Sequence, residues 1–257
     1  MSDQILPNSC NREGISNCCK KIINLCPKTA IATYKEKPHI LEPEKVQLVD
    51  YSQNTYLVRG NMPVTREEGS GDRVFDYEAV MQVIGERLKE IGKTLSDDVI
   101  FADISFLNYV SDADSLDLEI SWFDQHPSKG CIWVYPLVGT KINPVKQSKK
   151  TRGLVQQNMD VDGLTDFMGR LHQLVQSNCG KTFIIYMHCE SGVDRAGEAA
   201  ACYMMQYLGY SYEKAMAIDT ELAGRPIKKV NHNAVRWYAH QLRDVKGMSS
   251  IGPIDGK

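Results

Sequence analysis

The sequence HCESGVDRAG, which begins at His188, constrains the fold of this chain more than any other feature. It places Cys189 and Arg195 six positions apart, with Gly192 between them. A short apolar run (182–187) precedes it and an alanine-rich segment follows it, an order that indicates a strand, a tight loop and a helix. In such a loop the backbone N–H groups converge on one point, where the helix also presents its positive end. The sequence therefore predicts a cradle for a dianion.

The residue types in this loop favour phosphoryl-transfer chemistry. A thiol at a helix N-terminus beside an arginine should be a thiolate at neutral pH, so Cys189 is expected to be nucleophilic. It could attack the phosphorus of a bound phosphate ester, hold the phosphoryl group and pass it to water. Arg195 could bind two phosphate oxygens at once and, with the loop amides, stabilise their charge during both steps.

The string resembles the signature of the protein-tyrosine phosphatase superfamily: a histidine, a cysteine, five residues and an arginine. The resemblance covers roughly residues 45–245 and is strongest over 160–200. It implies Cys189 as the catalytic nucleophile and Arg195 as a catalytic phosphate ligand. It also implies a phosphate-binding loop made of Glu190, Ser191, Gly192, Val193, Asp194 and Arg195. The competing interpretation is a buried structural cysteine beside a surface arginine.

One position departs from the pattern of the superfamily. A serine or threonine usually follows the arginine and stabilises the thiolate and the departing cysteine, but this chain has Ala196 there. One lost hydrogen bond to a charged group costs about 1.5–3 kcal/mol, on the order of ten- to a hundred-fold in rate. We therefore expect slow breakdown of the phosphoenzyme. A pseudophosphatase that binds phosphate with little turnover is an alternative.

Hydrolysis also needs a proton donor for the leaving oxygen. In the superfamily an aspartate on a loop upstream of the cysteine supplies it, and this chain has no Trp-Pro-Asp sequence to mark that loop. Asp160 lies 29 residues before Cys189 in a predicted loop and is the preferred catalytic acid. Asp162 is the alternative, although it could instead cap the next helix. Asp166 should lie within that helix.

Composition limits the class of protein. The 257 residues are 42% hydrophobic and 24% charged, enough for one large domain. A net charge of −2 argues against nucleic acid as a partner. The sequence has no apolar run long enough for a membrane span and no secretory signal at its start, so we expect a cytoplasmic protein.

Cysteine usage agrees with a reducing compartment. Four cysteines lie near the start, at Cys10, Cys18, Cys19 and Cys26. Their spacing fits no zinc site, and we expect reduced thiols, with local disulfides as the alternative. Cys131, Cys179 and Cys202 are expected in the core. The expected chemistry requires neither a metal ion nor a cofactor.

Strands that alternate with helices indicate an α/β fold with a central, mainly parallel sheet flanked by helices. Expected strands cover 56–63, 98–105, 131–137 and 182–187, and expected helices cover 76–92, 164–175, 196–208, 212–222 and 231–243. Residues 108–118 are expected to form a surface loop. We predict an N-terminal extension (1–44), a phosphatase domain (45–246) and a flexible tail (247–257).

Protein phosphotyrosine or dual-specificity substrates are the leading prediction, and phosphoinositides or inositol phosphates are second. The sequence Gly-x-Asp-Arg, which contains Asp194, is similar to the loop of myotubularin-type and several bacterial lipid phosphatases. The segment 141–152 carries five basic residues and no acid. Folded over the pocket, it would attract phosphate-rich head groups and allow peripheral membrane contact; the alternative is a solvated loop. Glu190 is expected to point outward and to disfavour highly anionic substrates.

Overall fold

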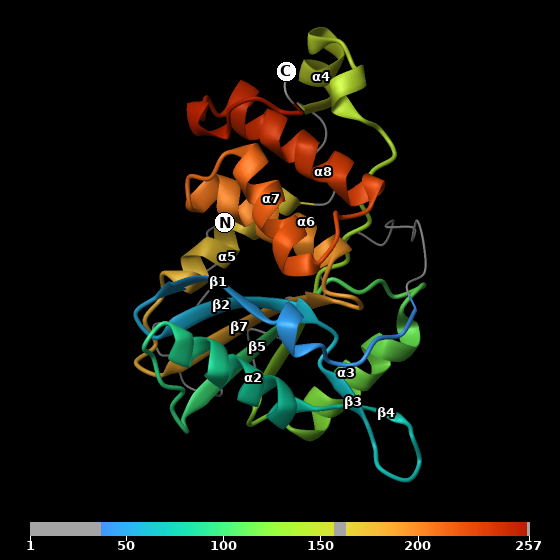
Figure 1. The fold of residues 1–257 in the computed structure, drawn as a ribbon, viewed down its shortest axis with the longest axis vertical. Helices are drawn as coiled ribbons and strands as arrows, with labels where there is room; N and C mark the ends of the chain where they lie inside the picture. The colour runs from blue at the N-terminus through green and yellow to red at the C-terminus, as the bar shows by residue number, and fades with distance from the viewer. Residues whose placement is uncertain (1–36, 157–162, 256–257) are drawn as a thin grey trace, which may run out of the picture.

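The computed structural model describes residues 37–156 and 163–255. Within these residues, five strands form one sheet in the order β1-β2-β7-β5-β6 (Figure 1). They are β1 (Gln47–Ser52), β2 (Thr55–Asn61), β5 (Val99–Ser105), β6 (Gly130–Val134) and β7 (Thr182–Cys189). All pairings are parallel except that of β1 with β2. The predicted α/β fold with a mainly parallel central sheet is confirmed.

Helices cover both faces of this sheet, as Figure 1 shows. One face carries α5 (Leu164–Val175), α6 (Asp194–Tyr207), α7 (Tyr212–Ala223) and α8 (Lys229–His240), the last extended by a π-helical turn, Gln241–Val245. The other face carries α2 (Tyr77–Glu90), α3 (Ala113–Gln125) and the small antiparallel ribbon of β3 (Val64–Arg66) and β4 (Arg73–Phe75). The short α4 (Lys149–Gln156) lies beyond α8.

Strand β7 lies in the middle of the sheet, and all of its residues are buried. Because both faces of a parallel sheet are covered, a central strand is apolar throughout. Successive residues therefore enter two different cores: Ile185 and Met187 pack under α5 and α6, whereas Ile184 and Tyr186 pack under α2 and α3. The strand ends at Cys189, at the carboxyl edge where α/β proteins bind ligands.

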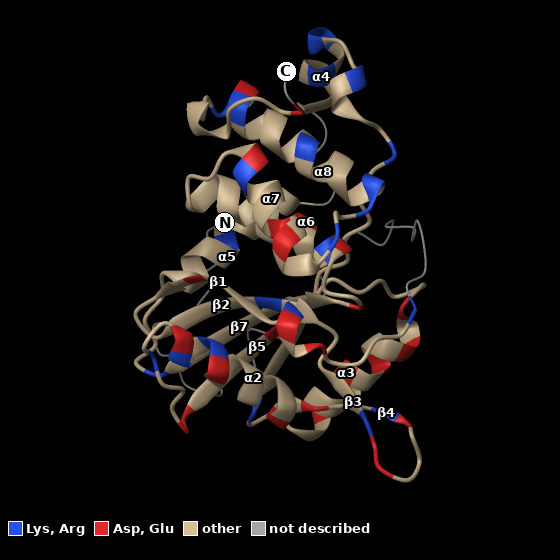
Figure 2. Cartoon of the chain, viewed as in Figure 1, with Lys and Arg blue, Asp and Glu red and all other residues tan. Residues whose placement is uncertain are grey.

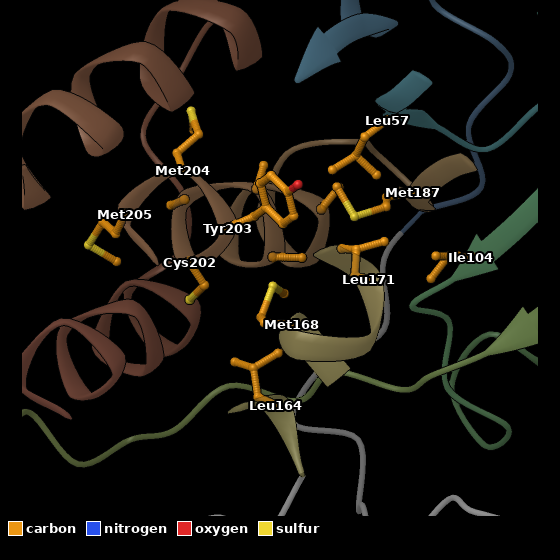
Figure 3. Close-up of a cluster of buried hydrophobic side chains, with 14 of the residues drawn as sticks. Leu57, Ile104, Leu164, Met168, Leu171, Met187, Cys202, Tyr203, Met204 and Met205 are labelled. Carbon is orange, nitrogen blue, oxygen red and sulfur yellow. The ribbon is translucent and has the colours of Figure 1, made fainter. Parts of the chain in front are cut away.

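The larger core surrounds α6, as Figure 3 shows. Met187 of the sheet, Met168 and Leu171 of α5 and Tyr203 of α6 are fully or almost fully buried in it. The many alanines of α6 allow the neighbouring helices to approach closely, so this helix is buried along almost its whole length. The loop before α6 is thus fixed by a rigid strand on one side and a rigid helix on the other.

Several local predictions are confirmed. The helices predicted over 76–92 and 212–222 are α2 and α7. The side chain of Asp76 caps α2 by accepting a hydrogen bond from the Ala79 amide, and Ser211 caps α7 in the same way through Lys214. Each expected strand overlaps an observed one, and the predicted last helix is α8 with its π-helical turn. The basic segment 141–152, for which a solvated loop was one interpretation, differs from that interpretation because it contains the first part of α4.

Two predictions are wrong. Residues 108–118 are not simply a surface loop, because α3 starts at Ala113 and the residues before it include the buried Asn108 and Asp112. Residues 247–255 are not a flexible tail. Ile251 and Ile254 are buried in the larger core, so this segment packs against the domain.

None of the described helices is long and apolar enough to cross a membrane. The described cysteines agree with the expectation of core positions: Cys131 and Cys202 are buried, and Cys179 is half-buried. Cys10, Cys18, Cys19 and Cys26, like most of the predicted N-terminal extension, lie outside the described residues.

Candidate active site

The residues after β7 form a tight loop that leads directly into α6. The carbonyl oxygen of Glu190 accepts a hydrogen bond from the backbone N–H that follows β2, at 3.2 Å. The carbonyl oxygen of Gly192 accepts one from Nη2 of Arg59, at 2.8 Å. Because C=O and N–H point in opposite directions across a trans peptide, the N–H groups of Ser191 and Val193 are directed to the other side of the loop. This is the arrangement expected of an anion cradle.

Gly192 is the residue that lets the loop close. Its φ of +70° lies in the left-handed region that favours glycine. A Cβ atom at this position would lie 2.8 Å from the backbone nitrogen of Asn61 and 2.9 Å from the carbonyl carbon of Gly60. The loop therefore packs directly against the end of β2, and no other residue type fits without a shift.

Cys189 and Arg195 lie at the two ends of this loop. Cys189 is the last residue of β7 and is fully buried, and Arg195 lies in the first turn of α6. The strand and helix predicted on either side of the motif are thus confirmed, and the helix directs its positive end toward the loop. Ala196, the departure from the family pattern, is buried among apolar neighbours and has no hydroxyl to offer the cysteine.

A buried carboxylate holds the guanidinium of Arg195. Nη1 of Arg195 donates to Oδ2 of Asp112 at 2.7 Å and to the carbonyl oxygen of Phe106 at 3.2 Å. Asp112 also accepts the backbone N–H of Asn108 at 2.9 Å. Burial alone would raise the pKa of Asp112, but the bond from Arg195 lowers it overall. Asp112 was missed because it falls in a predicted surface loop; the signal available was an acid directly before a helix.

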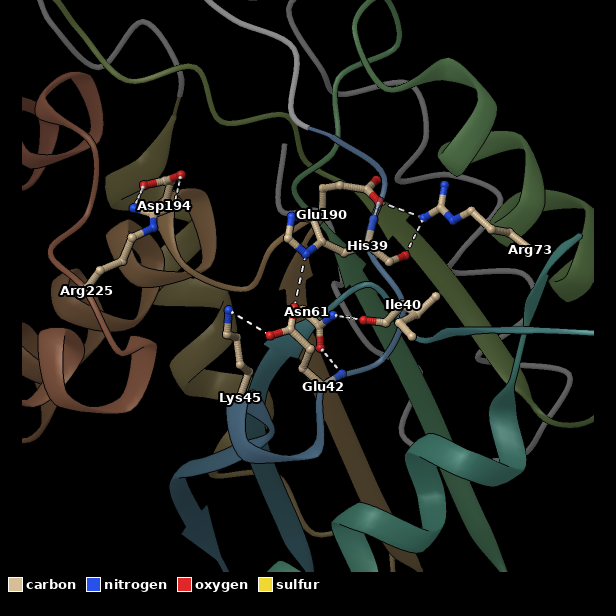
Figure 4. Close-up of polar contacts among 9 residues, drawn as sticks. All are labelled: His39, Ile40, Glu42, Lys45, Asn61, Arg73, Glu190, Asp194 and Arg225. Carbon is tan, nitrogen blue, oxygen red and sulfur yellow. Dashed lines mark hydrogen bonds and ion pairs between the residues drawn. The ribbon is translucent and has the colours of Figure 1, made fainter. Parts of the chain in front are cut away.

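Glu190, the first residue of the loop, points into the protein, as Figure 4 shows. Its Oε1 accepts from Nη2 of Arg73 at 2.6 Å and from the backbone N–H of His39 at 2.7 Å, and only 2% of the residue is exposed. The expectation of an outward-pointing side chain is wrong because Arg73, on β4, offers a cation inside. Since Arg73 compensates its charge and its side chain is buried, Glu190 presents no exposed negative charge to a ligand.

Asp194, at the other end of the loop, is also buried and paired (Figure 4). Its two oxygens each lie 2.9 Å from a guanidinium nitrogen of Arg225. The backbone N–H and the Nζ of Lys228 add contacts at 2.7 Å and 3.0 Å. Burial would raise the pKa of Asp194, but Arg225 and Lys228 lower it to about 2. The low pKa keeps Asp194 ionised near neutral pH, where it is paired with these two cations.

Three buried ionisable groups lie next to Cys189, around His188. Nε2 of His188 is 3.0 Å from Oδ1 of Asp103 and 3.1 Å from Oε1 of Glu119. Burial alone would lower the pKa of His188, but the two carboxylates raise it to about 9. Burial raises the pKa of Glu119 to about 8. The three ligand atoms lie within 4.8 Å of one another, close enough to hold a metal ion, but an imidazolium between two acids accounts for them without one.

The proton donor remains a prediction. Asp160 and Asp162 both lie outside the described residues, whereas Asp166 lies on α5, as expected.

The basic segment 141–152 does not cover the loop. Figure 2 shows α4, with its basic positions in blue, at the far end of the helical layer, beyond α8. Trp237 of α8 donates its indole N–H to the carbonyl oxygen of Ile142 at 2.9 Å, which attaches the segment to that helix. The interpretation of this segment as a lid over the pocket is therefore wrong. The alternative of a solvated surface segment holds, since Lys141, Lys146, Lys149 and Lys150 are all exposed.

No protein-family model and no curated protein matches the chain. Solved structures similar to it include kinase associated phosphatase with its catalytic-site cysteine replaced by serine (17% identity, 82% of this chain and 97% of that chain, TM-score 0.43). The Siw14 catalytic core is also similar, with 15% identity over 83% of this chain and 95% of that chain and a TM-score of 0.34. So is OH1 from the Orf virus, a tyrosine phosphatase, with 11% identity over 88% of this chain and 96% of that chain and a TM-score of 0.29. Kinase associated phosphatase and OH1 are phosphatases by name.

Proposed function

We propose that this chain is a cysteine-dependent phosphatase that hydrolyses phosphate monoesters through a phosphocysteine intermediate on Cys189. One observation carries the proposal. In the loop between Cys189 and Arg195, the carbonyls of Glu190 and Gly192 point away from the inner side of the loop and accept hydrogen bonds from the β2 side, and the loop ends at the N-terminus of α6. This arrangement supports the proposal because backbone amides and a guanidinium close to a thiol are the groups that binding and attack on a phosphate dianion require.

The reaction has two steps. The Cys189 thiolate attacks phosphorus, a P–S bond forms, and the P–O bond to the leaving group breaks as the ester oxygen takes a proton from the general acid. Water then attacks phosphorus and gives a proton to the deprotonated acid, the P–S bond breaks, and inorganic phosphate leaves with the thiolate and the acid regenerated. Arg195 and the loop amides stabilise the equatorial oxygens in both steps. Asp160 is the proposed acid, with Asp162 as the alternative.

Phosphotyrosine and other phosphorylated residues of proteins are the first proposed substrates, because the resemblance to dual-specificity phosphatases points to them. Inositol phosphates or phosphoinositides are the second candidate. The cations that Asp194 holds beside the loop favour this candidate.

The test is hydrolysis of para-nitrophenyl phosphate without added metal, between about pH 5 and pH 8. The wild type should be active and Cys189→Ser inactive, whereas Cys179→Ser, a half-buried cysteine away from the loop, should retain wild-type activity. Equal activity of wild type and Cys189→Ser would refute the thiol mechanism. Binding of phosphate by a wild type without turnover would favour the pseudophosphatase.

A substitution at position 196 can distinguish a slow enzyme from a protein that binds phosphate without turnover. Ala196→Ser adds the hydroxyl usual in the superfamily. If phosphoenzyme breakdown limits the rate, turnover should rise about ten-fold or more. A wild type near zero with a steep rise in the variant would identify a protein that mainly binds phosphate.

A further inference from the structure

A buried ion pair connects β2 and α7 to the loop that follows Cys189. Arg59 lies on β2, a strand whose residues are all buried, and is itself only 1% exposed. Its Nη1 donates to Oδ1 of Asp219, a residue of α7 with no exposed surface. Its Nη2 donates to the carbonyl oxygen of Gly192 at 2.8 Å. One guanidinium is thus shared between a carboxylate and the backbone of the loop.

Gly197, the last residue of the sequence HCESGVDRAG, provides the space for this pair. A Cβ atom at this position would lie 2.6 Å from Oδ1 and 2.9 Å from Oδ2 of Asp219. It would also lie 2.8 Å from Cγ2 of Ile227. Because position 197 has no side chain, the Asp219 carboxylate can lie directly against α6 and still reach Arg59.

Stability alone does not account for the pair. Removing two charges from water is costly, and replacing a buried ion pair by apolar side chains of similar volume is often neutral or stabilising. Burial raises the pKa of Asp219 although Arg59 opposes this shift, so for this carboxylate the cost of desolvation exceeds the stabilisation by the guanidinium. A charged residue at position 59 therefore needs a second reason, and its bond to Gly192 supplies one.

This bond fixes the peptide group between Gly192 and Val193. The carbonyl oxygen of Glu190 accepts a backbone N–H, that of Met62, whereas the carbonyl oxygen of Gly192 accepts the side chain of Arg59. Across a trans peptide the N–H of Val193 points in the opposite direction, to the inner side of the loop. Glycine has more backbone freedom than any other residue, so the orientation of this peptide depends on an outside contact.

We infer that Arg59 is a positioning residue for the anion cradle: it holds the Gly192 carbonyl away from a bound phosphate and the Val193 N–H toward it. Asp219 orients Arg59 from the other side. Neither side chain touches the substrate. The inference rests on the proposed phosphatase function and adds to it two residues that lie 133 and 27 positions from Gly192, outside the sequence motif.

The first test is the dissociation constant of inorganic phosphate, measured by calorimetry, which requires no turnover. Arg59→Met alone would leave Asp219 buried without its cation. The informative variant is therefore the double replacement Arg59→Met and Asp219→Leu, which exchanges the pair for apolar side chains of similar shape. The dissociation constant should rise about ten-fold, and the midpoint of urea unfolding should not fall.

Arg87→Met is the matched control. Arg87 also donates to a carboxylate, that of Glu90, and to two backbone carbonyl oxygens, but it lies on α2, on the other face of the sheet. This variant should bind phosphate as tightly as the wild type.

Arg59→Lys tests the same role with the charge retained. One ammonium group cannot reproduce the two separate donors that bind Asp219 and Gly192. The kcat for para-nitrophenyl phosphate should fall by about ten-fold or more, with a smaller change in KM, because a misplaced amide is lost mainly from the transition state. Wild-type kcat in this variant would contradict the positioning role.

The binding measurement separates failure of this inference from failure of the proposed function. Unchanged phosphate affinity in the double variant would overturn the positioning role alone. A loss of affinity that occurs only together with a lower urea midpoint would assign the pair to stability and would also overturn it. A wild type that binds no phosphate would refute the anion cradle, and with it both proposals. A wild type that binds phosphate without turnover, with weaker binding in the double variant, would support the positioning role and refute only the enzyme.

Discussion

The carboxylate of Asp112 lies 2.7 Å from the guanidinium of Arg195, so the arginine that ends the loop after Cys189 is held by the residue before α3. A buried arginine with a fixed partner is already oriented before a phosphate arrives. Less side-chain entropy is then lost when the phosphate binds. The pair links the loop to a different part of the sheet, across 83 residues of sequence.

Asp112→Asn should therefore weaken phosphate binding more than stability. The amide oxygen can still accept from Arg195, but the charge that holds the guanidinium is gone, so inhibition by inorganic phosphate should weaken about ten-fold. Phosphate competition against para-nitrophenyl phosphate measures this. Asp98→Asn, which breaks a partly exposed ion pair with Lys181, is the control and should change nothing. Unchanged inhibition in Asp112→Asn would contradict the proposed orienting role.

The pair of Glu190 and Arg73 should be a stability determinant. Arg73→Met would leave a buried carboxylate uncompensated and should lower the free energy of unfolding by about 3 kcal/mol. The double variant with Glu190→Gln should recover part of that loss. Urea unfolding of the four proteins gives the coupling energy, and additive effects would show that the two side chains do not interact.

Gly192 should tolerate no side chain. Gly192→Ala adds a Cβ 2.8 Å from the Asn61 backbone at a positive φ, so activity should fall by at least a hundred-fold, with a stability loss of more than about 1 kcal/mol. Gly209 has a similar φ of +68° but nothing within 4 Å of its added Cβ. Gly209→Ala therefore carries only the conformational cost and should keep wild-type activity. Equal losses in both variants would show that close packing at Gly192 is unimportant.

The buried cluster around His188 should make stability depend on pH. His188 and Glu119 both have raised pKa values in the fold, about 9 and about 8, so the folded protein binds protons more tightly than the unfolded chain. Their contribution to the free energy of unfolding is complete at low pH and is lost above about pH 9. Between about pH 5 and pH 9 it decreases by at most about 1.4 kcal/mol per pH unit for each group.

Glu119→Gln tests this pH dependence, because it removes Glu119 as a titrating group and also removes one of the two carboxylates that raise the pKa of His188. Urea unfolding at several pH values between about 5 and 9 should give a shallower slope in this variant. Glu78→Gln, which replaces an exposed acid, should keep the wild-type slope. A slope that is the same in all three proteins would mean that the cluster does not exchange protons on unfolding.

Local signals were sufficient for the strand, loop and helix around Cys189, because the apolar run, the glycine and the alanine-rich helix are contiguous in the sequence. The helices that begin after Asp76 and Ser211 were also predictable from local sequence, and each begins at a local side-chain cap. The side chains that complete the site were not. Arg73 is 117 residues from Glu190, and only the fold brings them together.

Polarity was also a poor guide to burial. Asp112 was expected in a surface loop, Glu190 was expected to point outward, and Asp194 was assigned no partner. Each of them is buried because an arginine from another element neutralises its charge. The basic segment 141–152 shows the opposite case. Its composition suggested a phosphate-binding lid, but its attachment to α8 leaves the charges in solvent.

The central claim is a covalent phosphocysteine, and trapping it is the most direct test. Wild-type protein mixed with substrate should be quenched in acid within milliseconds, and the peptide that contains Cys189 should be analysed by mass spectrometry. The account predicts one added phosphoryl group on Cys189, formed and lost at rates compatible with turnover, and none in Cys189→Ser. Hydrolysis that proceeds with this peptide unmodified at every time point, and that persists in Cys189→Ser, would contradict it.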